Sequence, residues 1–477
     1  MNKLSKKNIF YLSIAFFLIG VFLRFYQINF ESYWWDEMLG FWTADPNINI
    51  NETIHRQRNH DLTSIIFHLL LKSFYKIFGY NPELGRYIPF LFGILSIPLL
   101  GILSKQVKDN DSYLISILLI SINIYLIAYS QETRHYSLVF LASIVNLIIY
   151  YNITFTSNTG TQKIFVFLSF ILFSVFSLSL SPFILIIFFS QIIHSVYEIL
   201  FFRKRNFLIL LSAPIILILY VILNYDFLFV DLANQKNHFI ANIEWNFIYN
   251  LFFSRFFGSA IMGFIYLTVL LFLLNYCKEK IFIKPNKYLP LIFILLFSYI
   301  VPFLYGIFFV PILFDRYIIF VLIPIILLLS TLIYEVKKSY LRNIIILILL
   351  IPSLINIFLE ITLRDETKPE FNQLIKHLAN SETKKMTLLI DNEKITKKTL
   401  SIVENYIKSN IIVKKNNLEI FDFYNLPDDI NNVWVICYER FTGPTCEFPE
   451  NKSANFKLID SIKFYLVEAK LIQVNKL

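Results

Sequence analysis

The sequence predicts a mostly α-helical protein, namely a polytopic membrane helix bundle of about 11 spans followed by a small C-terminal α/β domain. Hydrophobic residues make up 56% of its 477 residues and charged residues only 16%, whereas soluble proteins carry about a quarter charged residues. After Glu360 the composition changes, and Lys, Asn, Asp and Glu become frequent. We therefore expect a membrane domain over residues 1–361 and a soluble exterior domain over residues 362–477.

The membrane domain is predicted from apolar segments of about 20 residues, the length that crosses a bilayer. They lie near residues 9–27, 85–104, 112–129, 135–151, 163–180, 183–202, 207–223, 258–276, 288–308, 316–334 and 342–361. Residues 62–78 also have helical spacing, but Lys72 and Lys76 interrupt the apolar run. We expect that helix to lie along the membrane surface, within a first exterior loop over residues 28–84.

Basic residues in alternate connections predict the orientation, because short cytoplasmic loops are rich in Lys and Arg. These residues are Lys3, Lys6, Lys7, Lys105, Lys108, Arg203, Lys204, Arg205, Lys278, Lys280, Lys284, Lys287, Lys337, Lys338 and Arg342. The N-terminus is then cytoplasmic, and the first loop and the tail are exterior. The net charge of +9 is explained by topology, without a nucleic-acid partner.

No A-x-A-like site follows the first span, so we expect it to stay uncleaved. The Asn-, Ile- and Lys-rich composition and the short chain favour a bacterial plasma membrane.

The tail is predicted to be a domain of about 110 residues with alternating helices and strands. Helical spacing occurs at 369–380 and near 394–408, and strand-like runs at 386–390, 433–437 and 464–469. Cys437 and Cys446 lie in this domain, where an exterior location permits a disulfide; two free thiols are the alternative. Cys277 ends a span on the cytoplasmic side, and we expect it to be inert. The chain contains no metal-binding spacing of the CxxC kind.

The first loop carries the residues that best suit a carbohydrate. Trp34 and Trp35 stand next to the acids Asp36 and Glu37, and His60-Asp61 follows further along. Aromatic rings stack on the apolar face of a sugar, and a carboxylate can take the proton from an attacking hydroxyl. The alternative is an ordinary exterior loop with Trp at the lipid interface.

Three arginines stand at exterior span ends: Arg86, Arg134 within Tyr129–Tyr136, and Arg316 beside Tyr317. A guanidinium matches the geometry of a phosphate, and lipid phosphates lie at this depth. Each arginine could also simply extend towards the interface. The spans carry almost no ionisable residue at mid-depth, and His194 and Glu198, near a cytoplasmic end, are expected to be structural. This distribution favours a site at the membrane surface over a transport pathway.

Several pieces, in order, resemble the GT-C class of membrane glycosyltransferases, closest to the family 39 type of protein O-mannosyltransferases and aminoarabinose transferases. They are WWDE (34–37), the amphipathic helix, glycine turn and Arg-headed span of residues 60–100, YSQETRHYSL (129–138), FDRYIIFVLIP (314–324) and the exterior tail. The likeness covers about the first 150 residues well and the rest in architecture. The chain departs from the family at His60-Asp61-Leu62-Thr63, where many relatives have prolines.

The resemblance implies a GT-C-like bundle that transfers a sugar from a polyprenyl-phosphate donor to an acceptor at the exterior face. By analogy Asp36 is the general base, with Glu37 as its neighbour or stand-in. Arg134 and Arg316 neutralise the leaving phosphate, and Glu132 and Asp61 position the sugar or share a divalent metal ion with Asp36. No cofactor is certain. The remaining expected substrate-binding residues are Trp34, Trp35, His60, Arg86, Tyr129, Tyr136 and Tyr317.

Other classes of membrane protein stay open at this point. An O-antigen-type polymerase or ligase also has exterior arginines, but it does not explain the acid pair after the first span. A flippase or transporter of lipid-linked sugars predicts polar residues through the bundle interior, which the sequence mostly lacks. The sugar (hexose or pentose) and the acceptor (protein, lipid or polysaccharide) are not specified, and membrane lipids are the remaining expected partner.

Overall fold

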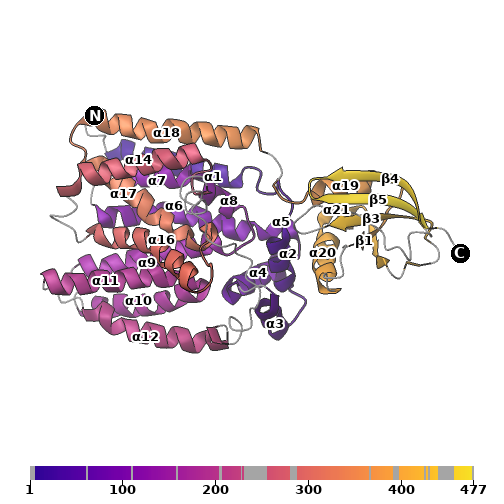
Figure 1. The fold of residues 1–477 in the computed structure, drawn as a ribbon, viewed down its shortest axis with the longest axis horizontal. Helices are drawn as coiled ribbons and strands as arrows, with labels where there is room; N and C mark the ends of the chain where they lie inside the picture. Colours follow the sequence, from indigo (N-terminus) through magenta and orange to yellow (C-terminus); the bar gives the residue numbers. More distant parts are fainter. Residues whose placement is uncertain are drawn as a thin grey trace. The chain divides into compact units, whose positions relative to one another are not determined.

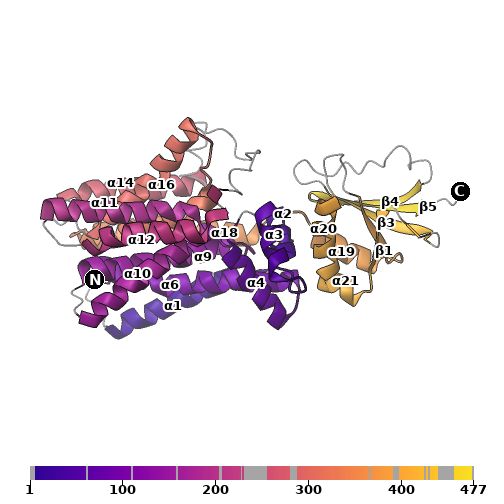
Figure 2. The same ribbon diagram turned by 90° about the horizontal axis from the view of Figure 1, so that it is seen from below.

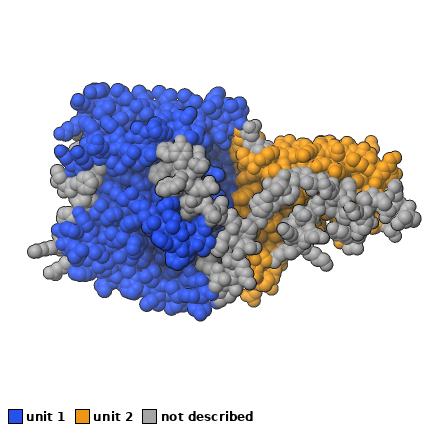
Figure 3. Space-filling model, viewed as in Figure 1, with its two compact units in different colours: residues 1–26, 62–67, 89–363 blue, residues 27–61, 68–88, 364–477 orange. Residues whose placement is uncertain are grey.

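The chain folds into two compact units, coloured separately in Figure 3. Unit 1 comprises residues 1–26, 62–67 and 89–363, and unit 2 comprises residues 27–61, 68–88 and 364–477. The structure, a computed structural model, describes residues 6–60, 63–108, 111–156, 160–202, 207–226, 228–229, 255–279, 287–364, 367–389, 397–423, 426–427, 430–438 and 456–474. Each unit is considered by itself.

Unit 1 is a bundle of long apolar helices that lie side by side (Figures 1 and 2). Its elements are α1 (Lys6–Phe25), α6 (Tyr87–Val107), α7 (Tyr113–Ser121), α8 (Ile124–Ser130), α9 (Tyr136–Phe155), α10 (Gly160–Leu180), η1 (Pro182–Ile184), α11 (Leu185–Phe202), α12 (Phe207–Leu223), α14 (Ala260–Tyr276), α16 (Leu289–Phe308), η5 (Asp315–Val321), α17 (Leu322–Glu335) and α18 (Ser339–Thr362). In the apolar 18-residue window of η5–α17, 89% of the window is buried, whereas in that of α18 only 22% is buried. We conclude that α17 occupies the interior of the bundle and that α18 lies at its rim.

Every apolar segment predicted to span the membrane coincides with a helix or a helix pair of this bundle. Among the described residues, eight helices are long and apolar enough to cross a membrane, and α7 with α8 makes a ninth candidate bent by 60°. The helices α12 and α14 have 17 residues each, or about 25 Å, slightly less than the hydrocarbon core. The predicted polytopic helix bundle is confirmed, and the protein is a multi-pass membrane protein. Its orientation and the identity of its membrane stay predictions.

The segment predicted as one span at 112–129 is instead broken between α7 and α8. The side chain of Asn123 accepts a hydrogen bond from the amide of Leu126 at 2.9 Å and caps the start of α8. The buried guanidinium of Arg24 donates to the carbonyls of Ile120 at 2.8 Å and Ser121 at 3.2 Å, at the end of α7. Both helix ends therefore have partners for their unpaired backbone groups. The hydropathy profile does not reveal such capping, so the sequence predicted the apolar segment but not the 60° bend within it.

Replacing Arg24 with Met is expected to destabilise unit 1 by about 3 kcal/mol, because buried carbonyls at the break would lose their donors. The measurement is unfolding of the purified protein in detergent. The matched control is Lys7→Met on the exposed face of the same helix, which should change stability by less than about 0.5 kcal/mol. Equal effects of the two substitutions would show that Arg24 does not stabilise the break.

Unit 2 combines the helices of the first loop with the tail. Its elements are α2 (Trp35–Thr43), α3 (Ile50–His60), most of α4 (Ile65–Phe78), α5 (Pro82–Gly85), α19 (Phe371–Asn380), α20 (Lys397–Ser409), α21 (Ile411–Lys415), β1 (Lys385–Leu389), β2 (Glu419–Phe421), β3 (Asn432–Tyr438), β4 (Phe456–Phe464) and β5 (Val467–Val474). The predicted domain boundary between residues 361 and 362 falls at the end of α18. It stays a prediction, because the two units are defined by packing alone.

The tail contains a five-stranded mixed sheet in the order β2-β1-β3-β5-β4. Strand β1 runs parallel to β2 and β3, and β5 runs antiparallel to β3 and β4. Side chains of β3 alternate between two buried faces: Trp434 and Tyr438 meet rings of α19, whereas Val433 and Val435 pack against Phe423 and neighbouring apolar residues. The predicted small α/β domain is confirmed.

Two details of the predicted tail need comment. The strand predicted at 464–469 is wrong, because β4 ends at Phe464 and β5 begins at Val467. Leu466, in the turn between them, has a φ of 55°. Because this turn residue is apolar, the sequence pattern continued through the turn and did not indicate a hairpin. Cys277 is a buried thiol that is not part of a disulfide, and Cys437 is disulfide-bonded. Its predicted partner Cys446 lies outside the described residues, so that pairing stays a prediction.

Candidate functional site

The predicted site residues fall into two groups, one in each unit, and each group is described by itself. Unit 2 contains Trp34, Trp35, Asp36, Glu37, His60 and Arg86. Unit 1 contains the hairpin after α8 and the start of η5, with the remaining residues of the prediction. Asp61 lies outside the described residues.

Residues 34–37 form the acid turn, the start of α2. Trp34 is the N-cap and makes no side-chain capping hydrogen bond, while Asp36 and Glu37 lie in the first turn. The N-terminus of a helix favours negative charge, so both acids suit this position. Their surroundings differ: Asp36 is half-buried beside half-buried Trp34 and Trp35, whereas Glu37 has no exposed surface. Of the two adjacent acids, only Asp36 therefore has access to solvent.

Glu37 is held in a buried charge cluster. Arg86 donates to both carboxylate oxygens, with Nε–Oε1 at 3.2 Å and Nη2–Oε2 at 3.1 Å. The ammonium of Lys368, from the tail, lies 2.9 Å from Oε2 of Glu37 and 3.7 Å from the carboxylate of Glu31. Two cations thus face two carboxylates, and the buried charge of Glu37 is compensated on both sides.

Arg86 uses its full donor capacity inside the protein. Besides Glu37, it donates to the carbonyls of Ile28 at 3.1 Å, Glu31 at 2.7 Å and Ser32 at 3.2 Å. A guanidinium has five N–H donors, and these contacts employ all of them. Arg86 therefore holds the loop together. The substrate contact expected from its position at a span end stays a prediction.

The other aromatic and basic residues of the first loop stabilise the turn between α2 and α3. The guanidinium of Arg56 lies 3.9 Å from the ring centre of Trp42 and donates to the Trp42 carbonyl at 2.8 Å. His60 lies with its ring centre 5.9 Å from that of Trp42. Lys72 donates to the carbonyls of Asp45 at 2.7 Å and Ile48 at 2.6 Å. The face of Trp42 is thus covered, which leaves Trp34 and Trp35 as the candidate sugar platform.

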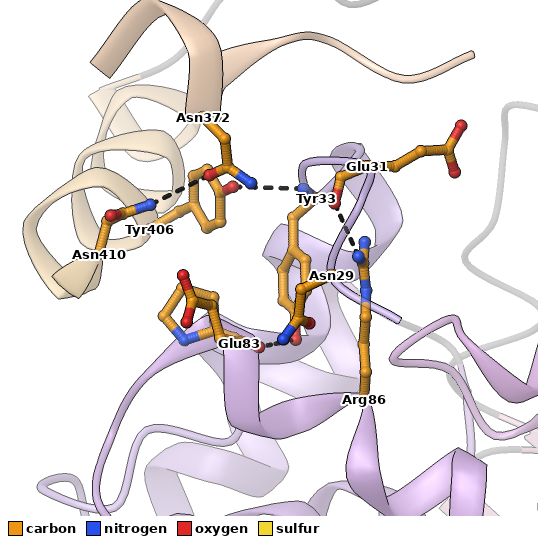
Figure 4. A pocket seen from close by; sticks show the side chains of 9 residues that line it. Asn29, Glu31, Tyr33, Glu83, Arg86, Asn372, Tyr406 and Asn410 are labelled. Carbon is orange, nitrogen blue, oxygen red and sulfur yellow. Dashed lines mark hydrogen bonds between the residues drawn. The ribbon is translucent and has the colours of Figure 1, made fainter. Parts of the chain in front are cut away.

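A polar niche forms where the first loop meets the tail within unit 2 (Figure 4). It is lined by Asn29, Glu31, Tyr33, Pro82, Glu83, Arg86, Asn372, Tyr406 and Asn410. The Tyr406 hydroxyl accepts a hydrogen bond from the amide of Tyr33 at 3.3 Å, and burial raises the pKa of Tyr406 to about 12. The cavity measures about 10 Å³, roughly the room of one water molecule. It is a packed junction with no space for a sugar ring.

The second group gathers in unit 1 as the hairpin cluster, composed of Tyr129, Glu132, Arg134, Tyr136, Arg316 and Tyr317. The guanidinium of Arg316 lies 5.7 Å from the ring centre of Tyr136 and 5.9 Å from that of Tyr317. The rings of Tyr129 and Tyr136 are 5.2 Å apart, edge to face.

Charges surround these rings. Glu132, Asp315 and Arg316 lie close enough to the Tyr129 hydroxyl to act on it electrostatically. Arg134 is buried on the same hairpin, and Arg316 is half-buried. A half-buried guanidinium beside tyrosine rings can bind a phosphate through charge and hydrogen bonds together.

The possible metal site of Asp36, Asp61 and Glu132 is not assembled by the part of the chain that can be described. Within that part, no three His, Cys, Asp or Glu side chains gather closely enough to hold a metal ion. Asp36 and Glu132 belong to different units. The shared divalent ion stays a prediction.

Comparisons with known proteins give the fold. The chain matches no protein-family model and no curated protein sequence. Among solved structures it is similar to ArnT from Cupriavidus metallidurans in the apo state, with a TM-score of 0.58, 8% identity, and 96% of this chain and 97% of that chain covered. The chain has a GT-C fold. The same ArnT bound to undecaprenyl phosphate gives a TM-score of 0.57 at 8% identity over the same shares.

The oligosaccharyltransferase of Archaeoglobus fulgidus, in its apo form, is a second neighbour, with a TM-score of 0.50 and 14% identity. The alignment covers 80% of this chain but only 59% of the archaeal chain, so the protein spans less than two thirds of that enzyme. The fold expected from the sequence resemblance is confirmed. Membership of family 39 stays a prediction, because identities this low establish architecture alone.

Proposed function

We propose that the protein transfers a sugar from a polyprenyl-phosphate donor to an acceptor at the exterior face of the membrane. The observation that carries the proposal is the GT-C architecture, shared over 96% of the chain with a structure that was solved with undecaprenyl phosphate bound. The half-buried Arg316 of the hairpin cluster and the tyrosine rings beside it support the proposal, because a guanidinium suits a lipid phosphate.

In this proposal Asp36 is the general base. The acceptor hydroxyl attacks the anomeric carbon of the sugar, and Asp36 takes the hydroxyl proton. The bond from the anomeric carbon to the phosphate oxygen breaks, and the polyprenyl phosphate leaves with the electron pair. Glu37 is a poor base in comparison, because Arg86 and Lys368 already bind its carboxylate. Trp34 and Trp35 would stack on a sugar ring beside the base.

The hairpin cluster would hold the donor phosphate in the same proposal. Arg316 and Arg134 neutralise the charge that develops on the leaving phosphate, which lowers the barrier to departure. Tyr129, Tyr136 and Tyr317 donate hydrogen bonds or contact the lipid, and Glu132 orients the sugar. The family 39 type, the sugar class and the acceptor belong to the proposal and are decided by experiment.

One structural observation favours a second candidate, transport of a lipid-linked sugar. Polar side chains connect α9, α10 and α11 inside unit 1: Asn146 donates to Ser174 at 2.9 Å, Gln191 donates to Asn146 at 2.7 Å, and Tyr150 meets His194 at 2.6 Å. A transporter places polar groups inside its bundle. In an enzyme the same bonds hold three helices together.

The deciding experiment incubates the purified protein in detergent with radiolabelled polyprenyl-phosphate sugars and a membrane extract as acceptor source. We expect release of the lipid phosphate and label in the acceptor fraction. Binding of the carrier without turnover in any extract would favour the transporter. Absence of both binding and turnover would contradict both candidates.

Replacing Arg316 with Ala is expected to raise the KM for the polyprenyl-phosphate sugar by about 10- to 100-fold, since a charged hydrogen bond contributes about 1.5–3 kcal/mol. Initial rates over a range of donor concentrations give this value. The control is Arg342→Ala, because Arg342 makes a comparable ring contact at 5.4 Å from Tyr334 outside the hairpin cluster. Unchanged values of both KM and kcat in the Arg316 variant would remove Arg316 from the donor site.

A further inference from the structure

The tail contacts nearly every residue that leads into the acid turn. The amide of Thr367 donates to the Glu31 carboxylate at 3.1 Å, and the amide of Asn372 donates to the Ser32 hydroxyl at 2.9 Å. The ring of Tyr406 stacks on that of Tyr33 with centres 5.5 Å apart. Lys368 completes the series at Glu37. The tail therefore holds the segment at residues 31–33, just before the acid turn, and again at Glu37 within it.

The start of α2 depends on such external support. Its N-cap, Trp34, provides no side-chain acceptor, so the usual local device that fixes a helix start is absent from this turn. Glu37 holds the start of α2 in place instead, because its carboxylate is fully buried between Arg86 and Lys368. Asp36 precedes it in the same turn, and moving Glu37 moves Asp36 with it.

The charges of the cluster explain why Lys368 matters separately from Arg86. Arg86 neutralises Glu37, and the ammonium of Lys368 neutralises Glu31 while it also contacts Glu37. Lys368 is itself largely buried, with 16% of its side chain exposed. Without it, the Glu31 carboxylate would lose its ion pair and the buried Glu37 carboxylate would lose one of its two cationic partners. The ionic link between the tail and the acid turn would then be broken.

We infer that Lys368, at the entry to the tail, is a positioning residue that sets the place of the general base through Glu37. This inference rests on the proposed function and extends it, since a residue of the tail then positions the general base of the transfer reaction. A misplacement of about 1 Å can lower a reaction rate on the order of 100-fold. The small volume of the polar niche shows that the first loop and the tail pack closely there, as a positioning role for the tail requires.

The test compares Lys368→Met, Lys368→Arg and Lys408→Met in the full-length protein in detergent. Lys408 is a matched control, because it pairs with Glu404 on the surface of the same tail and is 55% exposed. We expect Lys368→Met to lower kcat by about 10- to 100-fold with the donor KM changed less than about twofold. Lys368→Arg should restore most of kcat, and Lys408→Met should behave like wild type.

Amide hydrogen exchange supplies a second readout that does not need turnover. We expect faster exchange in α2 of Lys368→Met, with β3 as protected as in wild type, which shows that the tail stays folded. Unchanged kcat, or lost kcat without faster exchange in α2, would overturn the positioning role. If the wild type transfers no sugar at all, the proposed function fails, and exchange in α2 alone still decides whether Lys368 holds the acid turn.

Discussion

Asp36→Asn is expected to lower kcat for sugar transfer by about 10²- to 10⁴-fold, because an amide of the same shape cannot take the proton of the acceptor hydroxyl. The fold should survive, since Asp36 is half-buried and its favourable charge at the start of α2 contributes only about 0.3–1 kcal/mol. The measurement is release of polyprenyl phosphate by wild type and variant at matched concentrations of folded protein.

The control for Asp36 is Asp45→Asn, the same change at another acid of the first loop. Asp45 accepts a hydrogen bond from the amide of Asn47 at 2.9 Å, a local turn contact that an amide oxygen can also make, so activity should stay near wild type. Retained activity in Asp36→Asn would move the base to a different acid. Glu37 would then be the first residue to examine, since it shares the turn.

The fold was predictable because its main signals are local. Apolar runs of spanning length lie wherever unit 1 has a helix, and a change of composition marks the tail. The break at Asn123 and the turn at Leu466 were missed for a common reason. Hydropathy averages over many residues, whereas a helix cap or a two-residue turn depends on one or two side chains and on backbone angles.

The candidate site was predictable in part. Neighbouring acids after an aromatic pair indicated where to look, but adjacent residues of a helix point about 100° apart. Asp36 and Glu37 therefore have different surroundings, and the sequence does not say which of them is buried. The contact between Glu37 and Lys368 could not be predicted from the sequence either, since the two residues are 331 positions apart along the chain. Arg86 shows the same limit: its position at a span end was recognised, whereas its partners come from packing.

The second large effect is expected from Glu37→Gln, which should destabilise unit 2 by about 3–5 kcal/mol. The amide keeps the shape of the carboxylate but removes the charge that compensates the buried guanidinium of Arg86 and that also contacts Lys368. Uncompensated charge in a buried place costs far more than the pair itself contributes. Thermal unfolding followed by hydrogen exchange in α2 and β3 would locate the loss in unit 2.

The chain offers the same substitution at an exposed site, Glu52→Gln. Glu52 pairs with Arg56 at 2.9 Å and is 42% exposed, so water replaces the lost contact and the expected change is below about 1 kcal/mol. Comparable effects at Glu37 and Glu52 would contradict the buried charge cluster. The double variant Glu37→Gln with Arg86→Met should lose less free energy of unfolding than the two single variants lose together. The reason is that the double variant removes both charges of the pair and leaves neither one buried alone. Full additivity would mean that Arg86 stabilises the loop only through its carbonyl contacts.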